Sequence, residues 1–194
     1  MLFNFIKPVT IIFSKNINIL FVSCQATIIL LIYVICLLSY NSKYAGIITK
    51  TMAIMIGIQG SGKSTFCKKY LSNYQRVNLD TLHTRNKEKN FIEKCFENNE
   101  NIVIDNTNSR MEDREKYISR AKMMNYKVIA YFMQSIIKDC IERNNKRTGK
   151  ELVPAQAIAH TSNILQIPSY DEGFDELYYV KIENNDFVIS NWEQ

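Results

Sequence analysis

The chain has 194 residues and a net charge of +5, and 46% of its residues are hydrophobic. This length is enough for one domain with a sizeable core, or for one domain with an appendage. Four lysines within residues 1–51, a segment without acidic residues, account for most of the charge. The basic balance therefore does not by itself indicate a nucleic-acid-binding protein. The five cysteines form no Cys-x-x-Cys pair and lie near no histidine cluster, which argues against a zinc site and is typical of reduced thiols in the cytoplasm or nucleus.

An apolar leader, residues 1–51, precedes the rest of the chain. Within it residues 19–38 carry no charged side chain. A helix of that length, at about 1.5 Å per residue, spans about 30 Å, which is the thickness of a bilayer core. Two interpretations stay open. Either residues 19–38 form a transmembrane anchor and the protein is membrane-anchored, or the leader is upstream sequence and a soluble protein begins at Met52 or Met55.

A phosphate-binding motif follows the short apolar run at residues 53–56. Residues 57–65 match G-x-x-x-x-G-K-[ST]. The glycines let the backbone curl so that successive N–H groups point at one anion, and the helix that begins near Lys63 adds the positive end of its dipole. Lys63 is expected to contact the β- and γ-phosphates of ATP, and Ser64 to offer its hydroxyl to Mg²⁺. The residues expected to bind the nucleotide are Gly57, Gly60, Ser61, Gly62, Lys63, Ser64 and Thr65.

From Met52 onward, short apolar runs alternate with amphipathic segments, which is the pattern of an α/β protein with a parallel sheet. The predicted strands are residues 53–56, 76–79, 102–104, 126–133 and 176–182, with a short edge piece at 186–189. The predicted helices are residues 65–71, 89–98, 110–124, 135–145 and 154–165. A capping box at residues 109–112 marks the start of the third helix. Its apolar stripe consists of Met111, Ile118, Ala121 and Met124.

Two aspartates are expected at the carboxyl ends of predicted strands. Asp80 follows the second strand and Asp105 closes the third, and in an open parallel sheet these ends line the ligand crevice. Asp80 would act there as a general base for an attacking hydroxyl, or it would merely cap a helix. Asp105 has the position of a Walker B carboxylate, which holds Mg²⁺ or positions substrate, or it is an ordinary turn residue.

A basic cluster at residues 143–150 follows the fourth predicted helix. As a lid over the triphosphate, it would bring Arg143 or Arg147 to the charge that develops in phosphoryl transfer. As a solvated helix end, it would only complement the helix dipole. Arg110 and Arg114 lie on the first turns of the third predicted helix, where either would hold a substrate phosphate.

Taken together, these motifs resemble the kinase domain of polynucleotide 5′-hydroxyl kinases, above all the kinase half of the bifunctional polynucleotide kinase 3′-phosphatases. The resemblance covers about residues 52–182. It is carried by residues 57–66, Val77-Asn78-Leu79-Asp80-Thr81-Leu82 and Ile104-Asp105-Asn106-Thr107-Asn108. It implies transfer of the γ-phosphate of ATP to the 5′-hydroxyl end of DNA or RNA, with Mg²⁺, as in nucleic-acid end repair.

The resemblance also implies roles for single residues. Lys63 and Ser64 would handle ATP and metal, and Asp80 would bind and deprotonate the 5′-hydroxyl. Asp105 and Arg114 would contribute to the substrate side, and the lid would supply an arginine. Leu79 departs from the pattern, since the family usually has arginine there. No Asp-x-Asp-Gly-Thr motif occurs, so a 3′-phosphatase activity is not expected.

We therefore predict that residues 52–194 form a P-loop kinase domain. It would have a parallel sheet of about five strands in the order 2-3-1-4-5, helices on both faces and a helical lid, and it would act as a monomer. Two alternatives stay open: a P-loop kinase of a small metabolite or nucleoside, and a membrane-tethered ATP-binding protein without catalytic activity.

Overall fold

Alternating strands and helices make up residues 50–193, the part of the chain that the computed structural model describes. The strands are β1 (Thr51–Ile56), β2 (Gln75–Val77), β3 (Ile102–Ile104), β4 (Lys127–Met133), β5 (Glu176–Glu183) and β6 (Asp186–Asn191). The helices are α2 (Lys63–Tyr70), α3 (Leu79–Leu82), α4 (Arg85–Glu97), α5 (Met111–Met123), α6 (Ile137–Asn145) and α7 (Ala155–Asn163). Two 3₁₀ turns lie on either side of α7, η1 (Gly149–Glu151) before it and η2 (Tyr170–Glu172) after it.

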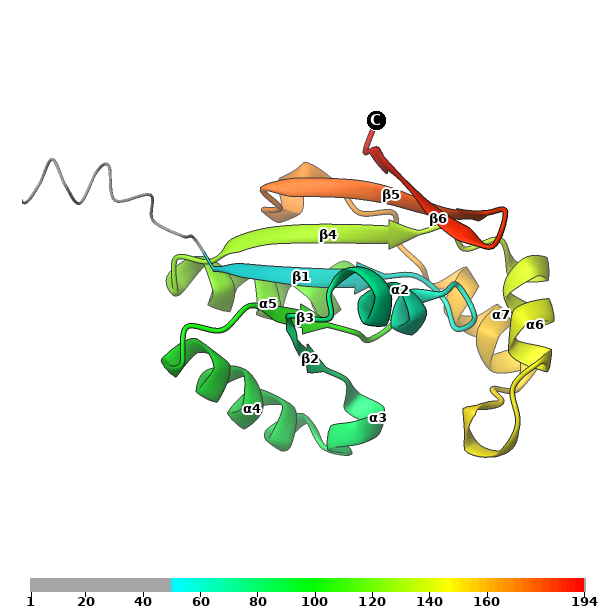
Figure 1. Cartoon of the computed structure of the whole chain (residues 1–194), viewed down its shortest axis with the longest axis horizontal. Helices are drawn as coiled ribbons and strands as arrows, with labels where there is room; N and C mark the ends of the chain where they lie inside the picture. The colour runs from blue at the N-terminus through cyan, green and yellow to red at the C-terminus, as the bar shows by residue number, and fades with distance from the viewer. Residues whose placement is uncertain (1–49, 194) are drawn as a thin grey trace, which may run out of the picture. The chain divides into compact units, whose positions relative to one another are not determined.

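The strands form one sheet in the order β2-β3-β1-β4-β5-β6 (Figure 1). β1 to β5 run parallel, and β6 pairs antiparallel with β5. The predicted α/β P-loop fold and its strand order are confirmed, and the edge piece predicted near residue 186 is a full sixth strand. The leader up to residue 49, with the segment at 19–38, lies outside the described residues. No helix within residues 50–193 has both the length and the apolarity needed to cross a bilayer.

Different helices cover the two faces of the sheet (Figure 1). Successive residues of a strand point to opposite faces. Met52, Ile54 and Ile56 belong to a core that includes residues of α4 and α5, whereas Ala53 and Met55 pack with residues of α2. A parallel strand that is buried on both faces needs an apolar residue at every position, so β1 reads as a continuous apolar run.

The second strand ends earlier than predicted. β2 stops at Val77, and the following residues form the short helix α3. Asn78 caps this helix, because its Oδ1 accepts a hydrogen bond from the Thr81 N–H at 3.3 Å, and asparagine is a preferred N-cap residue. Asp80 therefore lies in the first turn of a helix, three residues beyond the strand, and not directly at the strand end.

The predicted N-terminus and buried face of α5 also need correction. The Asp113 carboxylate accepts a hydrogen bond from the Arg110 N–H at 3.3 Å, so the capping interaction lies one residue beyond the predicted box at 109–112. Met111 and Met124, predicted on the apolar stripe, are 49% and 37% exposed. The residues that α5 buries are Arg114, Tyr117, Ile118 and Ala121. The predicted stripe thus contained two of the buried residues, Ile118 and Ala121, and a search for apolar residues passes over Arg114.

Candidate functional site

The phosphate-binding loop joins β1 to α2 through backbone conformations that favour glycine. Gly60 has a φ of 80° and Gly62 a φ of 100°, which residues with a Cβ rarely adopt. A Cβ atom at Gly60 would lie only 2.3 Å from the carbonyl oxygen of Cys140 on α6. The loop therefore passes directly against α6, and its path depends on the absence of a side chain at this position.

Lys63 is buried within the loop. Its Nζ donates hydrogen bonds to the carbonyl oxygens of Gly57 at 2.9 Å and Ile58 at 2.8 Å. Burial, with a smaller contribution from the charge of Arg147, lowers the pKa of Lys63 to about 8 against the opposing influence of Asp105. An ammonium group with two neutral partners in a buried position is well suited to receive an anion, because a charged acceptor makes a stronger hydrogen bond than a carbonyl does.

Asp105 follows β3 and is held by an arginine of the neighbouring strand. Arg76 on β2 donates from Nε to Asp105 Oδ2 at 2.7 Å, and its Nη2 pairs with the same oxygen. The Asp105 side chain is 1% exposed, whereas that of Arg76 is 35% exposed. The backbone is fixed as well, since the Asp105 N–H donates to the carbonyl oxygen of Val77 at 2.8 Å. Arg76 lies in no motif, and its pairing became visible only when the strands were placed side by side.

The residues after Asp105 connect the helix that carries Asp80 to the phosphate-binding loop. Asn106 Oδ1 accepts a hydrogen bond from the Leu79 N–H at the start of α3, at 3.0 Å. The carbonyl oxygen of Thr107 accepts one from the Gly57 N–H at 3.1 Å. Because β3 lies between β2 and β1 in the sheet, this segment spans from α3 to the loop at the carboxyl edge. Asp80 itself is exposed to solvent there.

The polar groups of this edge fit a nucleotide phosphate and a magnesium ion. Ser61 Oγ is buried and has no hydrogen-bond partner within residues 50–193, so it is available to a phosphate oxygen. Ser64 lies half-buried in the first turn of α2. Across the same residues no three His, Cys, Asp or Glu side chains gather to hold a metal. Mg²⁺ usually binds one or two protein groups together with water and substrate phosphates, so a magnesium site of this kind needs no such cluster.

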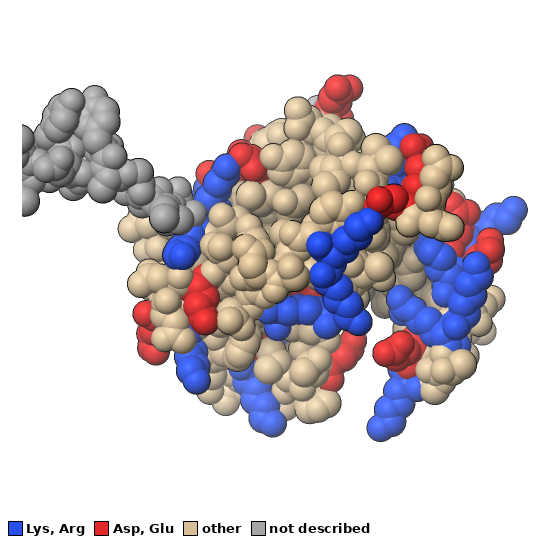
Figure 2. Space-filling view, viewed as in Figure 1, with Lys and Arg blue, Asp and Glu red and all other residues tan. Residues whose placement is uncertain are grey.

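The lid, α6 with residues 146–151, brings the basic cluster to the loop. Arg143 donates from Nε to the carbonyl oxygen of Gly60 at 2.8 Å and from Nη2 to Cys140 Sγ at 3.4 Å. Arg147 is half-buried, and its charge acts on Lys63. Figure 2 shows Lys and Arg side chains on both sides of the notch between the lid and the sheet. The two candidate arginines therefore differ, since Arg143 is bound to the loop backbone while the half-buried Arg147 influences Lys63 through its charge.

Arg114 occupies the interior and not the surface of the site. None of its side chain is exposed, and its Nε and Nη2 donate to the two Glu172 carboxylate oxygens at 2.6 Å and 2.7 Å. Its Nη1 donates to the carbonyl oxygens of Asn108 at 3.2 Å and Gln166 at 3.0 Å. The predicted contact with a substrate phosphate conflicts with this complete burial. Arg114 instead joins α5, η2 and the segment after β3.

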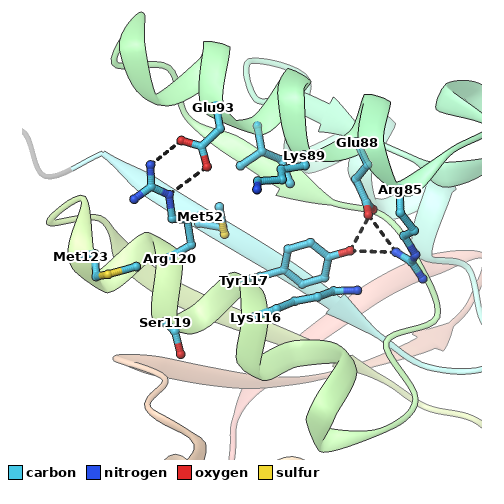
Figure 3. A pocket seen from close by; sticks show the side chains of 11 residues that line it. Met52, Arg85, Glu88, Lys89, Glu93, Lys116, Tyr117, Ser119, Arg120 and Met123 are labelled. Carbon is cyan, nitrogen blue, oxygen red and sulfur yellow. Dashed lines mark hydrogen bonds and ion pairs between the residues drawn. The ribbon is translucent and has the colours of Figure 1, made fainter.

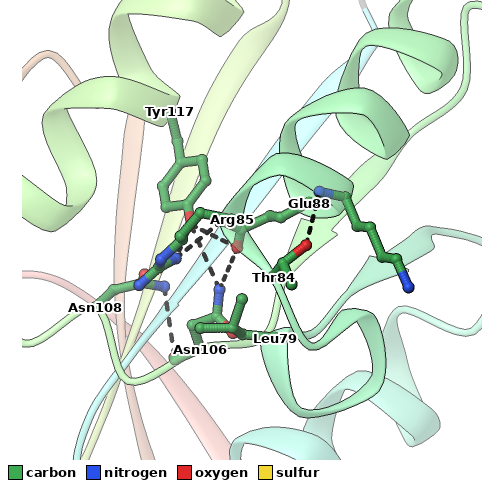
Figure 4. Close-up of polar contacts among 8 residues, drawn as sticks. Leu79, Thr84, Arg85, Glu88, Asn106, Asn108 and Tyr117 are labelled. Atoms are coloured by element: carbon green, nitrogen blue, oxygen red, sulfur yellow. Dashed lines mark hydrogen bonds and ion pairs between the residues drawn. The ribbon is translucent and has the colours of Figure 1, made fainter.

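A buried hydrogen-bond network lies next to α3 (Figure 4). Glu88 of α4, which is 3% exposed, accepts at Oε1 from Asn106 Nδ2 and from the Tyr117 hydroxyl, each at 2.8 Å. At Oε2 it accepts from Arg85 Nη1 at 2.8 Å. Burial alone would raise the pKa of Glu88, but the hydrogen bonds from Arg85 and Tyr117 hold it below its usual value. Glu88 and Arg85 are single helix residues outside any motif, so no sequence signal identified them.

A groove of about 790 Å³ runs between α4 and α5 (Figure 3). Arg85, Glu88 and Tyr117 line one end of it, and Glu93 and Arg120 pair at the other. No residue of the phosphate-binding loop lines this groove. It is therefore separate from the candidate site, although its first end is formed by the network beside α3.

The parallel sheet and the glycine loop at its edge define a P-loop protein. Comparison with known proteins refines this class. A family model described as an AAA domain matches residues 52–166, more than half of the chain. The chain belongs to this AAA domain family.

Curated relatives confirm the resemblance that the motifs predict. A protein of Acanthamoeba polyphaga mimivirus, provisionally named a bifunctional polynucleotide phosphatase/kinase, is 32% identical over 137 residues, which cover 66% of this chain and 32% of the relative. The bifunctional polynucleotide phosphatase/kinase of Schizosaccharomyces pombe is 27% identical over 129 residues, which cover 63% of this chain and 31% of the relative. The match thus spans about a third of these relatives.

A solved structure of AvrRxo1-ORF1:-ORF2 with ATP has a similar fold. It matches with a TM-score of 0.55 at 13% identity, over 73% of this chain and 57% of that chain. At this identity the likeness supports the fold alone.

Proposed function

We propose that the chain is a kinase that transfers the γ-phosphate of ATP to the 5′-hydroxyl end of DNA or RNA. The observation that carries this proposal is the segment after β3. Through Asn106 and Thr107 it hydrogen-bonds both to the helix that bears Asp80 and to the phosphate-binding loop. An accessible carboxylate and an anion-binding loop thus share the edge of the sheet where ligands bind in open α/β folds. The names of the two polynucleotide phosphatase/kinase relatives support a polynucleotide as the acceptor.

In this proposal the loop holds the phosphates of ATP. Its N–H groups and the N-terminus of α2 favour negative charge, and Gly57, Gly60 and Gly62 let the backbone approach. Lys63 would exchange its carbonyl partners for the β- and γ-phosphate oxygens. Mg²⁺, when bound, would neutralise the charge that develops during transfer. Ser64 and Asp105 would hold the ion.

Asp80 is the proposed general base. It accepts the proton of the 5′-hydroxyl and aims the hydroxyl oxygen at the γ-phosphorus. A bond forms between that oxygen and phosphorus, the bond from phosphorus to the bridging oxygen breaks, and ADP leaves. Positioning of the reactants and electrostatic stabilisation of the transition state account for most of the rate enhancement in such transfers. The exposed position of Asp80 suits an acceptor that is the end of a long polymer.

Of the two lid arginines, Arg147 is the better candidate for transition-state stabilisation. Arg143 is already engaged with the Gly60 carbonyl oxygen, so it supports the shape of the loop. Arg147 acts electrostatically on Lys63, the residue expected at the γ-phosphate. A cation at this place would neutralise the charge on the transferred group, as arginine fingers do in other P-loop proteins.

The test uses the full chain, γ-labelled ATP and an oligonucleotide with a 5′-hydroxyl, beside the same oligonucleotide with a 5′-phosphate. We expect label on the first only. Asp80→Ala should lower transfer by about 10²–10⁴-fold without weakening ATP binding. Asp171→Ala, which changes an exposed aspartate of η2, is the matched control and should leave transfer unchanged.

Label on neither oligonucleotide, or full activity of Asp80→Ala, would overturn the proposal. Transfer to a nucleoside or another small alcohol, with none to the oligonucleotide, would identify a small-molecule kinase. The proposal includes a monomeric protein of the cytoplasm or nucleus, as the sequence leads us to expect. Size-exclusion chromatography with light scattering tests the monomer.

A further inference from the structure

Asn106 satisfies a backbone donor at the start of α3. The Leu79 N–H is one of the first amides of that helix, which have no acceptor within the helix itself. It donates to Asn106 Oδ1 at 3.0 Å. The other half of the Asn106 amide, Nδ2, donates to Glu88 Oε1 at 2.8 Å. The side chain of Asn106 thus connects the first turn of α3 to a buried carboxylate on α4 (Figure 4).

Glu88 determines which way this amide points. An ionised carboxylate only accepts hydrogen bonds. The side of the Asn106 amide that faces Glu88 must therefore be the NH₂ group, which leaves Oδ1 for the Leu79 N–H. A side chain that could also donate would allow the amide to turn around, and Leu79 would then lose its acceptor.

Glu88 is itself held in place from two helices. The Tyr117 hydroxyl of α5 donates to Oε1, and Arg85 Nη1 of α4 donates to Oε2. Arg85 Nη1 also donates to the Tyr117 hydroxyl at 3.1 Å. Glu88 is 3% and Tyr117 4% exposed, so neither is available to a polymer substrate. Both belong to a network in which each buried polar group has a partner, the condition under which such networks rigidify a structure.

The helix that this network supports is short and has few other contacts. α3 contains four residues and fully buries none of them, although Leu82 packs against the core and the cap residue Asn78 donates from Nδ2 to the Asp105 carbonyl oxygen at 2.7 Å. A single helical turn is not stable in isolation, because nucleation is costly. The orientation of α3, and with it that of Asp80, must therefore come from contacts at its ends, of which Asn106 provides one.

We propose that Glu88, supported by Tyr117, is a positioning residue for Asp80. It fixes the amide of Asn106, Asn106 fixes the first turn of α3, and α3 carries the base. This inference rests on the proposed function, in which Asp80 accepts the proton of the 5′-hydroxyl. A displacement of a reacting group by about 1 Å costs about 10²-fold in rate, so the network matters for turnover even though it touches no substrate.

The central experiment is Glu88→Gln in the full chain. The neutral amide has both donors and an acceptor and no longer dictates the orientation of Asn106. We expect kcat for the 5′-hydroxyl oligonucleotide to fall about 10–100-fold, with the Kd for ATP unchanged. Tyr117→Phe removes the hydroxyl that donates to Glu88 and accepts from Arg85 and Asn106, but it keeps the carboxylate that dictates the orientation of Asn106, so it should lower kcat less. Glu93→Gln is the matched control, because Glu93 lies on the same helix and pairs with Arg120 outside the network. It should leave kcat unchanged.

A double-mutant cycle separates positioning from general damage. In an Asp80→Ala background, Glu88→Gln should cause no further loss, since its effect passes through Asp80. Independent damage would multiply the two losses. Amide hydrogen exchange measured by NMR gives a readout that does not depend on activity. The Leu79 N–H should exchange faster in Glu88→Gln than in wild type, and its exchange rate should be unchanged in Glu93→Gln.

Wild-type kcat and wild-type Leu79 exchange in Glu88→Gln would overturn the inference, and so would multiplicative losses in the cycle. If Glu88→Gln does not fold, the same measurements on Tyr117→Phe test the inference. An unchanged Leu79 exchange rate and an unchanged kcat in that variant would overturn it. A wild-type protein that transfers no phosphate to a 5′-hydroxyl refutes the proposed function instead. In that case the exchange measurement still reports whether Glu88 holds α3.

Discussion

Arg114 and Glu172 form a doubly hydrogen-bonded ion pair in the interior, with side chains that are 0% and 2% exposed. The two residues are 58 positions apart in the sequence, and the pair joins α5 to η2. Loss of one partner of a buried ion pair is costly because the other charge stays buried without compensation. The arginine that the motifs place on the substrate side therefore has a buried partner within the protein, and its contact with substrate stays a prediction.

Arg114→Ala is therefore expected to reduce the free energy of unfolding by about 3–5 kcal/mol. Urea denaturation followed by circular dichroism measures this change. Replacement of both partners, Arg114→Met with Glu172→Leu, should cost less than Arg114→Ala, because no unpaired charge remains. If Arg114→Ala is stable but binds the oligonucleotide poorly, this result would instead support the predicted contact between Arg114 and the substrate.

The lowered pKa of Lys63 predicts a pH dependence of ATP binding. Burial brings this pKa to about 8 from an ordinary value of 10.5. Below pH 8 the ammonium group is charged and ready for a phosphate, and above it the free protein must take up a proton to bind. Affinity for ATP should therefore fall about tenfold per pH unit above the pKa, as measured by calorimetry.

Lys63→Met is the control for this dependence. It should bind ATP weakly and show no change of slope near pH 8. The pH dependence of the free energy of unfolding has the opposite sign to the pH dependence of ATP affinity. Since the folded pKa lies below the unfolded one, the ligand-free protein gains stability as the pH rises from about 8 toward 10.5. An ATP affinity that is flat across this range in wild type would contradict the assignment of Lys63 as a phosphate contact.

Gly60→Ala should damage the loop. The new Cβ would meet the Cys140 carbonyl oxygen at 2.3 Å, and the φ of 80° is unfavourable for alanine. The backbone penalty is about 1–2 kcal/mol, and the overpacking adds about 1–3 kcal/mol. Gly149→Ala is the matched control, because its φ is 60° and nothing lies within 4 Å. Equal losses of stability and ATP affinity in the two variants would show that α6 does not confine the loop.

Substitutions of the two lid arginines should have different effects on kcat and on the Kd for ATP. Arg147→Ala is expected to lower kcat by about 10³-fold with little change in the Kd for ATP, as for other arginines that act on the transferred phosphate. Arg143→Ala should mainly raise the Kd for ATP, because it removes the donor to the Gly60 carbonyl oxygen. Steady-state kinetics and equilibrium binding on both variants measure the difference. The reverse pattern would assign the transition-state role to Arg143.

Local signals explain why the architecture could be predicted. Each parallel strand that is buried on both faces is a continuous apolar run, and the glycines of the loop mark the turn from β1 to α2. The start of α3 could not be predicted as readily, because Val77 and Leu79 resemble one extended run although Asn78 interrupts it as a helix cap. The catalytic roles of Asp80, Asp105 and the lid arginines stay predictions that the experiments above address.

The sequence by itself determined the fold class and the loop that binds phosphate, since these depend on composition and spacing within short segments, and the expected strand order followed from the P-loop class that the motifs indicate. Only the tertiary structure decided which polar and charged side chains are partners. Arg76 with Asp105, Arg114 with Glu172, and Glu88 with Asn106 meet from separate elements. The physical reason is that burial and hydrogen-bond partners decide whether a polar side chain supports the fold or stays free to bind a ligand. The burial and the partners of a side chain are both set only when distant segments pack together.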